Sequence, residues 1–171
     1  MLFSAGGALA QDSPFGLWKF LGTIDLEKTR TGAGVVFRFR YVAANADIFF
    51  FDAGKHWDSG LDDSKISALL AQTKRELAQA EEQGIYRNME LGPAEENVIS
   101  GQPFHLQRMT FWRTGLKQVS LTYTTGLRGK LLKYRITVPE VVSADIERDA
   151  EFLISTTLRK QVGFNAPWHI E

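Results

Sequence analysis

The sequence contains no cysteine. Its absence excludes disulfide bonds, thiolate nucleophiles, and zinc or iron–sulfur sites built from cysteine. Twenty Lys and Arg residues balance twenty Asp and Glu residues, so no net charge draws the chain to nucleic acid. No stretch approaches the roughly 18 continuous apolar residues of a membrane-spanning helix. We therefore predict a chain with no nucleic-acid partner and no transmembrane segment.

Recognised catalytic motifs are also missing. The sequence has no G-x-S-x-G nucleophile elbow, no phosphate loop and no dinucleotide fingerprint. Of the three histidines, His105 shares an expected strand face with Met109, and His169 lies in a short tail after Trp168. Neither has partners in a catalytic constellation. The sequence argues against an enzyme and predicts no cofactor.

What is present is enough for one domain. A chain of 171 residues that is 44% apolar has the size of a single domain and buries on the order of two thirds of its unfolded surface. Met1 to Ala10 is small and apolar and ends in the A-x-A pattern Ala8-Leu9-Ala10, typical of a signal-peptide cleavage site. We expect residues 1–10 to be a signal-peptide remnant cleaved after Ala10 and residues 11–171 to form one globular domain, in the periplasm or secreted. The alternative is a small-residue N-terminus without signal function.

The clearest structural pattern lies between Gly101 and Pro139. Apolar residues recur at every second position in two adjoining runs, Val119-Leu121-Tyr123 and Leu132-Tyr134-Ile136-Val138. The residues between them are polar: Gln118, Ser120, Thr122 and Thr124 in the first run, Lys133, Arg135 and Thr137 in the second. A period of two predicts a β-hairpin with one core face and one solvated face.

Other segments predict further strands and two helices. Alternation indicates strands at Phe15 to Leu26, Val35 to Tyr41 and Phe104 to Trp112, and the apolar run Ile48 to Phe51 indicates an interior strand. Weaker extended segments, Tyr86 to Leu91 and Asn97 to Ser100, are separated by an expected turn at Gly92-Pro93.

Helical spacing of three and four runs from Ile66 to Ala80 and from Ile146 to Val162. Gly84 and Gly163 stand where the two helices should end. We predict an α+β fold: a single-domain α/β/α sandwich, with a largely antiparallel sheet of about six strands and two main helices.

Two short motifs link this pattern to a known fold. Gly101-Gln102-Pro103 precedes the strands, and Tyr134-Arg135-Ile136-Thr137 ends the last strand before the second helix. In these motifs and in element order the chain resembles the PsbP-like group, which includes extrinsic photosystem II proteins, a Ran-binding nuclear transport factor and bacterial envelope proteins of the DcrB type. The resemblance implies a binding, assembly or accessory role, and it carries over no catalytic residue or cofactor motif.

The loop from Asp52 to Asp63 is the candidate site. It places a histidine, a tryptophan and carboxylates between a buried strand and a helix, and loops on a rigid scaffold often carry binding groups. We predict a ligand-binding site made by Asp52, His56, Trp57 and Asp58, with Trp57 exposed. Alternatively, His56 and Asp58 bind a metal together with Asp62 or Asp63. The simplest explanation is that Asp62 and Asp63 cap the helix and that His56 is a solvated turn residue.

Four cations, Arg38, Arg40, Lys133 and Arg135, project from the polar faces of strands. They either align into a basic stripe or are solvated sheet positions whose stems lie beneath a covering helix. We predict a periplasmic or secreted accessory or binding protein, with an unknown protein or a small molecule as its partner. The alternatives are a metal-assisted hydrolase that uses the loop 52–63 and a structural component of an envelope complex.

Overall fold

The computed structural model describes residues 14–61 and 63–162. The predicted signal segment, the expected stop at Gly163 and His169 lie outside these residues. The elements are, in chain order, β1 (Lys19–Asp25), β2 (Val35–Tyr41), β3 (Ala44–Phe51), α1 (Asp63–Glu82), β4 (Arg87–Ile99), β5 (Gln102–Arg113), β6 (Leu116–Leu127), β7 (Lys130–Pro139), a 3₁₀ helix (Glu140–Val142) and α2 (Ser143–Val162). Neither described helix is long and apolar enough to cross a bilayer.

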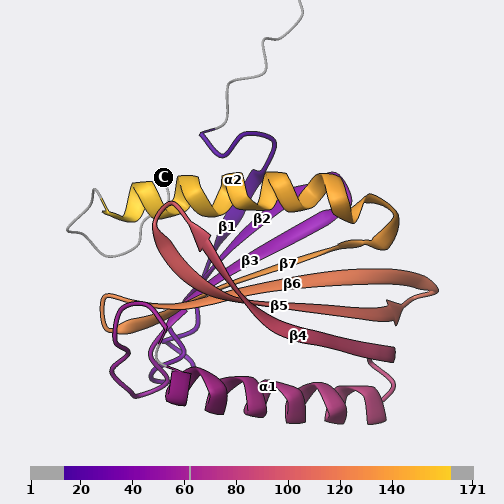
Figure 1. Ribbon diagram of the computed structural model, residues 1–171, viewed down its shortest axis with the longest axis horizontal. Coiled ribbons are helices and arrows are strands. Elements are labelled where there is room, and N and C mark those ends of the chain that lie inside the picture. Colours follow the sequence, from indigo (N-terminus) through magenta and orange to yellow (C-terminus); the bar gives the residue numbers. More distant parts are fainter. Residues whose placement is uncertain (1–13, 62, 163–171) are drawn as a thin grey trace, which may run out of the picture.

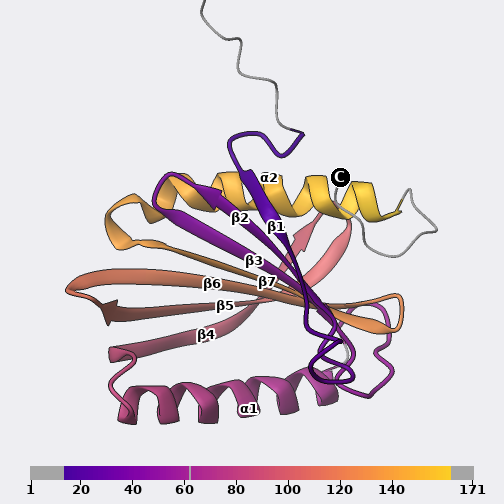
Figure 2. The same ribbon diagram turned by 180° about the vertical axis from the view of Figure 1, so that it is seen from behind.

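The strands form one antiparallel sheet in the order β1-β2-β3-β7-β6-β5-β4. Figures 1 and 2 show α2 along one face of this sheet and α1 along the other. The predicted α/β/α sandwich is confirmed, as is the hairpin of β6 and β7, which occupies the middle of the sheet. The sheet has seven strands in place of about six.

The additional strand is β4, which the sequence divides into two segments. Gly92-Pro93 is not a turn, because the strand continues through it with an irregular register between Leu91 and Ala94. Proline is tolerated here because β4 is an edge strand and can lose one N–H donor. The Gln107 side-chain amide of β5 donates to the Gly92 carbonyl, which the bulge leaves out of the ladder. The predicted turn is therefore a bulge.

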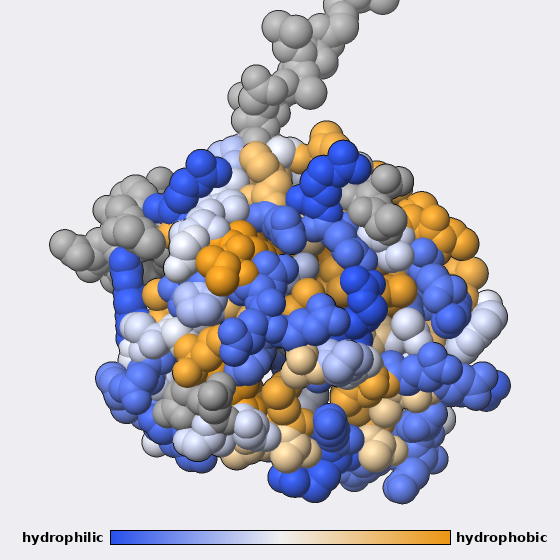
Figure 3. All heavy atoms as spheres, in the orientation of Figure 1, coloured by the Kyte–Doolittle hydropathy of each residue, from blue (hydrophilic) through white to orange (hydrophobic). Residues whose placement is uncertain are grey.

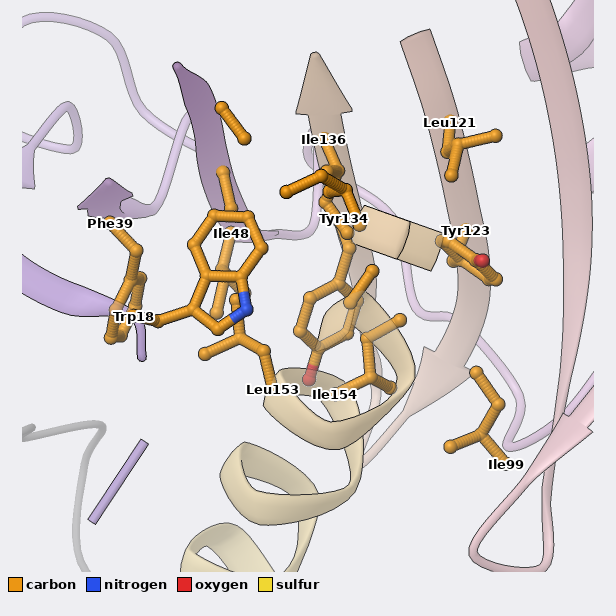
Figure 4. Packing of buried hydrophobic residues seen from close by; sticks show 14 of the residues in the cluster. Trp18, Phe39, Ile48, Ile99, Leu121, Tyr123, Tyr134, Ile136, Leu153 and Ile154 are labelled. Atoms are coloured by element: carbon orange, nitrogen blue, oxygen red, sulfur yellow. The ribbon is translucent and has the colours of Figure 1, made fainter. Parts of the chain in front are cut away.

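The main core lies between the sheet and α2. Figure 4 shows Leu153 and Ile154 of α2 directed toward Tyr134 and Ile136 of β7, and all four are fully buried. The Tyr134 hydroxyl lies 2.8 Å from that of Thr157 in α2, and burial raises the pKa of Tyr134 well above its usual value. The core face predicted from alternation is confirmed.

Helix α1 covers the other face more loosely. Among the apolar residues of its stripe, Ile66 is buried, whereas Leu69, Leu70, Leu77 and Ala80 are half-buried. The helix ends where predicted, with Gly84 at a φ of 73°. Backbone N–H groups of Gly84 and Ile85 donate to the carbonyls of Glu81 and Ala80, both at 2.9 Å, which is a Schellman cap.

Candidate functional site

The predicted loop site begins with Asp52, whose carboxylate is used structurally. One carboxylate oxygen lies 2.9 Å from Lys130 Nζ at the start of β7, and the other accepts from the Gly54 N–H at 2.8 Å. These two contacts, the lysine first, lower the pKa of Asp52. Asp52 therefore fastens the end of β3 to the β6–β7 hairpin.

Trp57 is buried, contrary to the prediction that it is exposed. Its side chain is 5% exposed and packs with Ile66 of α1 and Leu131 of β7. The indole N–H donates to the Asp52 carbonyl at 2.8 Å, and the Trp57 backbone N–H donates to the Gly129 carbonyl at 3.1 Å. The prediction was wrong because the loop folds back along the β6–β7 hairpin. Trp57 is thereby placed between apolar residues of α1 and β7, although its neighbours in sequence are polar.

The loop also joins the edge of the hairpin through its glycines. Gly60 and Gly126 exchange two backbone hydrogen bonds, each 2.9 Å long. A Cβ atom at Gly126 would lie 1.8 Å from the Asp58 carbonyl oxygen, so only glycine permits this approach. Backbone contacts far apart in sequence therefore hold the loop in place.

The other two predicted residues point outward. His56 and Asp58 side chains are 76% and 70% exposed, with His56 Nε2 3.8 Å from Asp58 Oδ1. Asp62 lies outside the described residues, and nothing is described of the Asp63 side chain. Among the residues that the structure describes, no group of three or more His, Asp or Glu could hold a metal. The structure thus divides the predicted loop site into an inward structural pair and an outward solvated pair.

A different site lies on the same side of the sheet. A cavity of about 250 Å³ separates α1 from strands β4 to β7; we call it the α1 cavity. On the face drawn in Figure 3, hydrophobic residues are seen in the band between the strands and α1. The α1 cavity is lined by residues of α1 (Leu69, Leu70, Thr73, Lys74, Glu76, Leu77 and Ala80), by Tyr86 just before β4, and by residues of β4 (Leu91), β5 (Gln107 and Met109), β6 (Ser120, Thr122 and Thr124) and β7 (Lys133 and Arg135).

The floor of the α1 cavity is the sheet face that the sequence predicts to be solvated. Thr122 pairs with Gln107, and Ser120 pairs with Met109, across β5 and β6. Ser120 and Thr124 are 1% exposed. The prediction of a wet face was wrong: these polar side chains lie beneath a helix, at the base of a cavity.

Two cations of β7 reach into the same cavity. Arg135 donates to the Tyr86 hydroxyl at 3.1 Å, and Lys133 Nζ lies 5.7 Å from the centre of the Phe49 ring. Within residues 14–61 and 63–162, neither Lys133 nor Arg135 forms a salt bridge. Burial, and after it the charge of Arg135, lowers the pKa of Lys133.

The proposed basic stripe is interrupted. Arg38 of β2 and Arg135 of β7 lie in one row across the sheet, with Asp47 of β3 between them. Arg38 pairs with Asp47 at 3.4 Å, and Arg40 donates to Asn45 at 3.4 Å. Both arginines of β2 are exposed. The four cations are thus a solvated pair on β2 and a half-buried pair beneath α1.

The sequence analysis did not predict the α1 cavity, although it predicted both the polar strand face and the helix that enclose it. The polar positions of β6 and β7 were identified, and so was a helix for each face of the sheet. A sheet covered on both faces has no solvated centre, so a polar central face beneath a helix indicates a polar-floored cavity. Combining the two predictions would have pointed to Thr122, Thr124, Lys133 and Arg135.

No protein-family model and no curated protein matches the chain. Its structure is similar to that of the cyanobacterial PsbP (CyanoP) from Synechocystis sp. PCC 6803, with 18% sequence identity, 91% of this chain and 96% of that chain covered, and a TM-score of 0.49. It is also similar to PA94 of Pseudomonas aeruginosa, a protein of unknown function, with 16% identity, 74% and 75% covered, and a TM-score of 0.39. The predicted α+β fold is confirmed, it is similar to the PsbP fold that the sequence resembles, and at these identities the likeness concerns the fold alone.

Proposed function

We propose that this protein is a non-enzymatic binding module whose ligand occupies the α1 cavity. The observation that carries the proposal is the hollow of about 250 Å³ between the helix and the sheet. Protein interiors are close-packed, and a cavity of roughly 150 Å³ is already large enough to admit benzene, so this one has room for a small organic molecule. Its walls combine apolar side chains with a few polar groups, as small-molecule sites do.

Binding is favoured over catalysis by the surroundings of the cavity hydroxyls. The Ser120 hydroxyl accepts a hydrogen bond from the Thr137 hydroxyl at 3.3 Å. Thr137 is not a base, so this contact does not activate Ser120 as a nucleophile. Thr122 and Thr124 make no side-chain hydrogen bond within the part of the chain that the structure describes. Such groups suit the recognition of a ligand.

Occupancy of the α1 cavity can be tested with small neutral probes. Benzyl alcohol and 1-hexanol, titrated into ¹⁵N-labelled protein, should shift the backbone amide signals of Leu77, Met109 and Thr122. Thr122→Trp fills the cavity from the sheet and Ala80→Phe fills it from the helix, so both variants should lose these shifts.

Thr23→Trp on exposed β1 is the matched control and should bind as the parent protein does. The proposal fails if the probes bind both cavity-filling variants unchanged or shift only signals far from the cavity.

We also propose that the protein works in the periplasm or outside the cell. The A-x-A pattern at Ala8-Leu9-Ala10 supports this. Expression in a bacterium with a periplasm, followed by intact mass measurement, should give a product that begins at Gln11. Ala10→Leu should block the cleavage, and a full-length product in the cytoplasm would contradict export.

A further inference from the structure

We infer that the ligand of the α1 cavity is a small organic anion, a carboxylate or a phosphate monoester with an apolar body, whose charge is bound by Lys133 and Arg135. The inference rests on the proposed function and names the class of its ligand. It goes beyond a general binding role because it assigns two residues to the charged group and a different set to the apolar group.

The two cations are placed to act together. Lys133 and Arg135 are two positions apart in β7 and so lie on the same sheet face, about 6.6 Å apart along the strand. The hydrogen bond from Arg135 to Tyr86 fixes one side of the guanidinium, and Tyr86 itself packs edge-on against Phe111 at 4.7 Å. A guanidinium has five N–H donors. The contact with Tyr86 uses one of them and orients the Arg135 guanidinium, and the remaining donors can bind an anion.

Neither cation of this pair forms a salt bridge among the described residues, and Asp47, which lies opposite Arg135 in the sheet, is paired with Arg38 at 3.4 Å. The other two half-buried cations of the sheet are matched: Lys117 lies 2.7 Å from Glu140 and Lys130 lies 2.9 Å from Asp52. Lys133 and Arg135 have no such contact among the described residues. Glu76 also lines the cavity, but its carboxylate accepts from the Gln72 side-chain amide at 2.8 Å and forms no salt bridge with Lys133 or Arg135 among the described residues. A half-buried cation without a counterion is costly, and an anionic ligand would supply one.

The rest of the lining fits the body of such a ligand. Leu70 and Leu77 from the helix and Met109 from the sheet provide an apolar wall. Thr122 and Thr124 place hydroxyl groups on the same face as the cations, where they can donate to anion oxygens. The volume admits a ring or a short chain together with its acid group.

The probes for the test are benzoate and phenyl phosphate, with benzyl alcohol as the neutral match, measured by calorimetry and by amide shifts at pH 7. We expect at least one anion to bind tenfold or more tightly than benzyl alcohol. Lys133→Met and Arg135→Met should each weaken that anion at least tenfold and leave benzyl alcohol unchanged. The anion that binds more tightly identifies the acid group as carboxylate or phosphate.

Arg40→Met is the matched control, because it removes the same charge from the same sheet face outside the cavity and leaves the Arg38–Asp47 pair intact. Equal affinity for the anions and the alcohol would overturn the inference but leave the α1 cavity as a binding site. Failure of all three probes to bind would overturn both proposals. Equal weakening by Arg40→Met would show a general charge effect and overturn the assignment to Lys133 and Arg135.

A second measurement separates recognition from folding. Without ligand, Lys133→Met should raise the melting temperature, because it removes a half-buried charge that lacks a partner. A variant that is more stable and yet binds the anion at least tenfold more weakly cannot owe its weaker binding to misfolding. A lower melting temperature together with unchanged anion binding would show that Lys133 is structural and would overturn the inference.

Discussion

The two long helices are the same length and cover opposite faces of one sheet, yet they do different things there. Among its described side chains, helix α2 buries the apolar stripe made by Ile146, Ala150, Leu153, Ile154 and Leu158. Helix α1 buries Ile66 and leaves most of its apolar stripe half-buried over a cavity. Since both helices are amphipathic, the difference must come from the surfaces beneath them.

Those surfaces are the two faces of the same strands. On β7, Tyr134 and Ile136 face α2, whereas Lys133 and Arg135 face the α1 cavity. Side chains alternate across a strand, so one hairpin presents an apolar surface to one helix and a polar, positively charged surface to the other. The side chains on each face of the sheet therefore determine whether the helix that covers this face packs into a core or encloses a cavity.

The largest expected effect tests this asymmetry directly. Leu153→Ala in α2 should lower the free energy of unfolding by roughly 2 to 5 kcal/mol, because a fully buried leucine leaves a cavity in a packed core. The matched change Leu77→Ala in α1 should cost about 1 kcal/mol or less, since Leu77 is half-buried and borders existing space. Urea unfolding of both variants measures the difference, and similar losses would contradict the comparison.

The contact that holds the start of the loop to the β6–β7 hairpin can be removed at Asp52. Asp52→Ala should destabilise the protein by about 1 kcal/mol, because Lys130 loses its partner and the Gly54 N–H its acceptor. The native contacts lower the pKa of Asp52, so its stabilisation is present above the pKa of the unfolded chain and is lost as pH falls through the lowered native value.

Urea unfolding from pH 7 down to pH 3 should therefore show a smaller acid loss in the Asp52→Ala variant than in the parent. Equal acid losses in the two proteins would show that Asp52 does not make this contribution.

A stabilising change is expected from Lys133→Met, on the order of 1 kcal/mol or less at neutral pH. Burial lowers the pKa of Lys133, so between that value and the ordinary lysine pKa the unfolded chain binds more protons than the native one. Native stability contributed through this group therefore rises with pH in that window. Thermal unfolding between pH 7 and pH 10 should show the advantage of the variant shrinking as pH rises. A variant less stable than the parent at pH 7 would refute the expectation.

The smallest effects are expected at the exposed part of the predicted loop site. His56→Ala and Asp58→Ala should each change the free energy of unfolding by no more than about 0.5 kcal/mol, because both side chains are solvated and their contact is long. They should also leave binding in the α1 cavity unchanged. Urea unfolding and probe titration measure the two outcomes, and loss of probe binding in either variant would return the site to the loop.

Local pattern was sufficient for most of the fold. Alternation located β6 and β7 and identified the face of Leu121 and Tyr134 that packs in the core, and the spacing of Ile66 and Leu77 located α1. The prediction of a turn at Gly92-Pro93 was wrong because the pair glycine–proline occurs both in turns and in bulges of edge strands. That distinction depends on the neighbouring strand, which supplies Gln107.

The candidate site could not be located in the same way. A polar residue facing water and one facing a cavity have the same alternation, so Thr122 and Lys133 carried no local sign of being covered. Trp57 was misjudged because its neighbours in sequence are polar, while its neighbours in space, Ile66 and Leu131, come from distant elements. In both cases the deciding contacts are long-range.

The close approach of the loop to Gly126 also limits how this chain can diverge. Every other amino acid would place a Cβ atom against the Asp58 carbonyl, so a saturation library at position 126 should retain glycine alone while neighbouring Leu127 accepts other apolar residues. A distant relative with a side chain at this position in β6 must carry its loop elsewhere. Where sequence identity is too low to align the loop, a glycine at the position of Gly126 in β6 therefore indicates that the loop passes close to this strand.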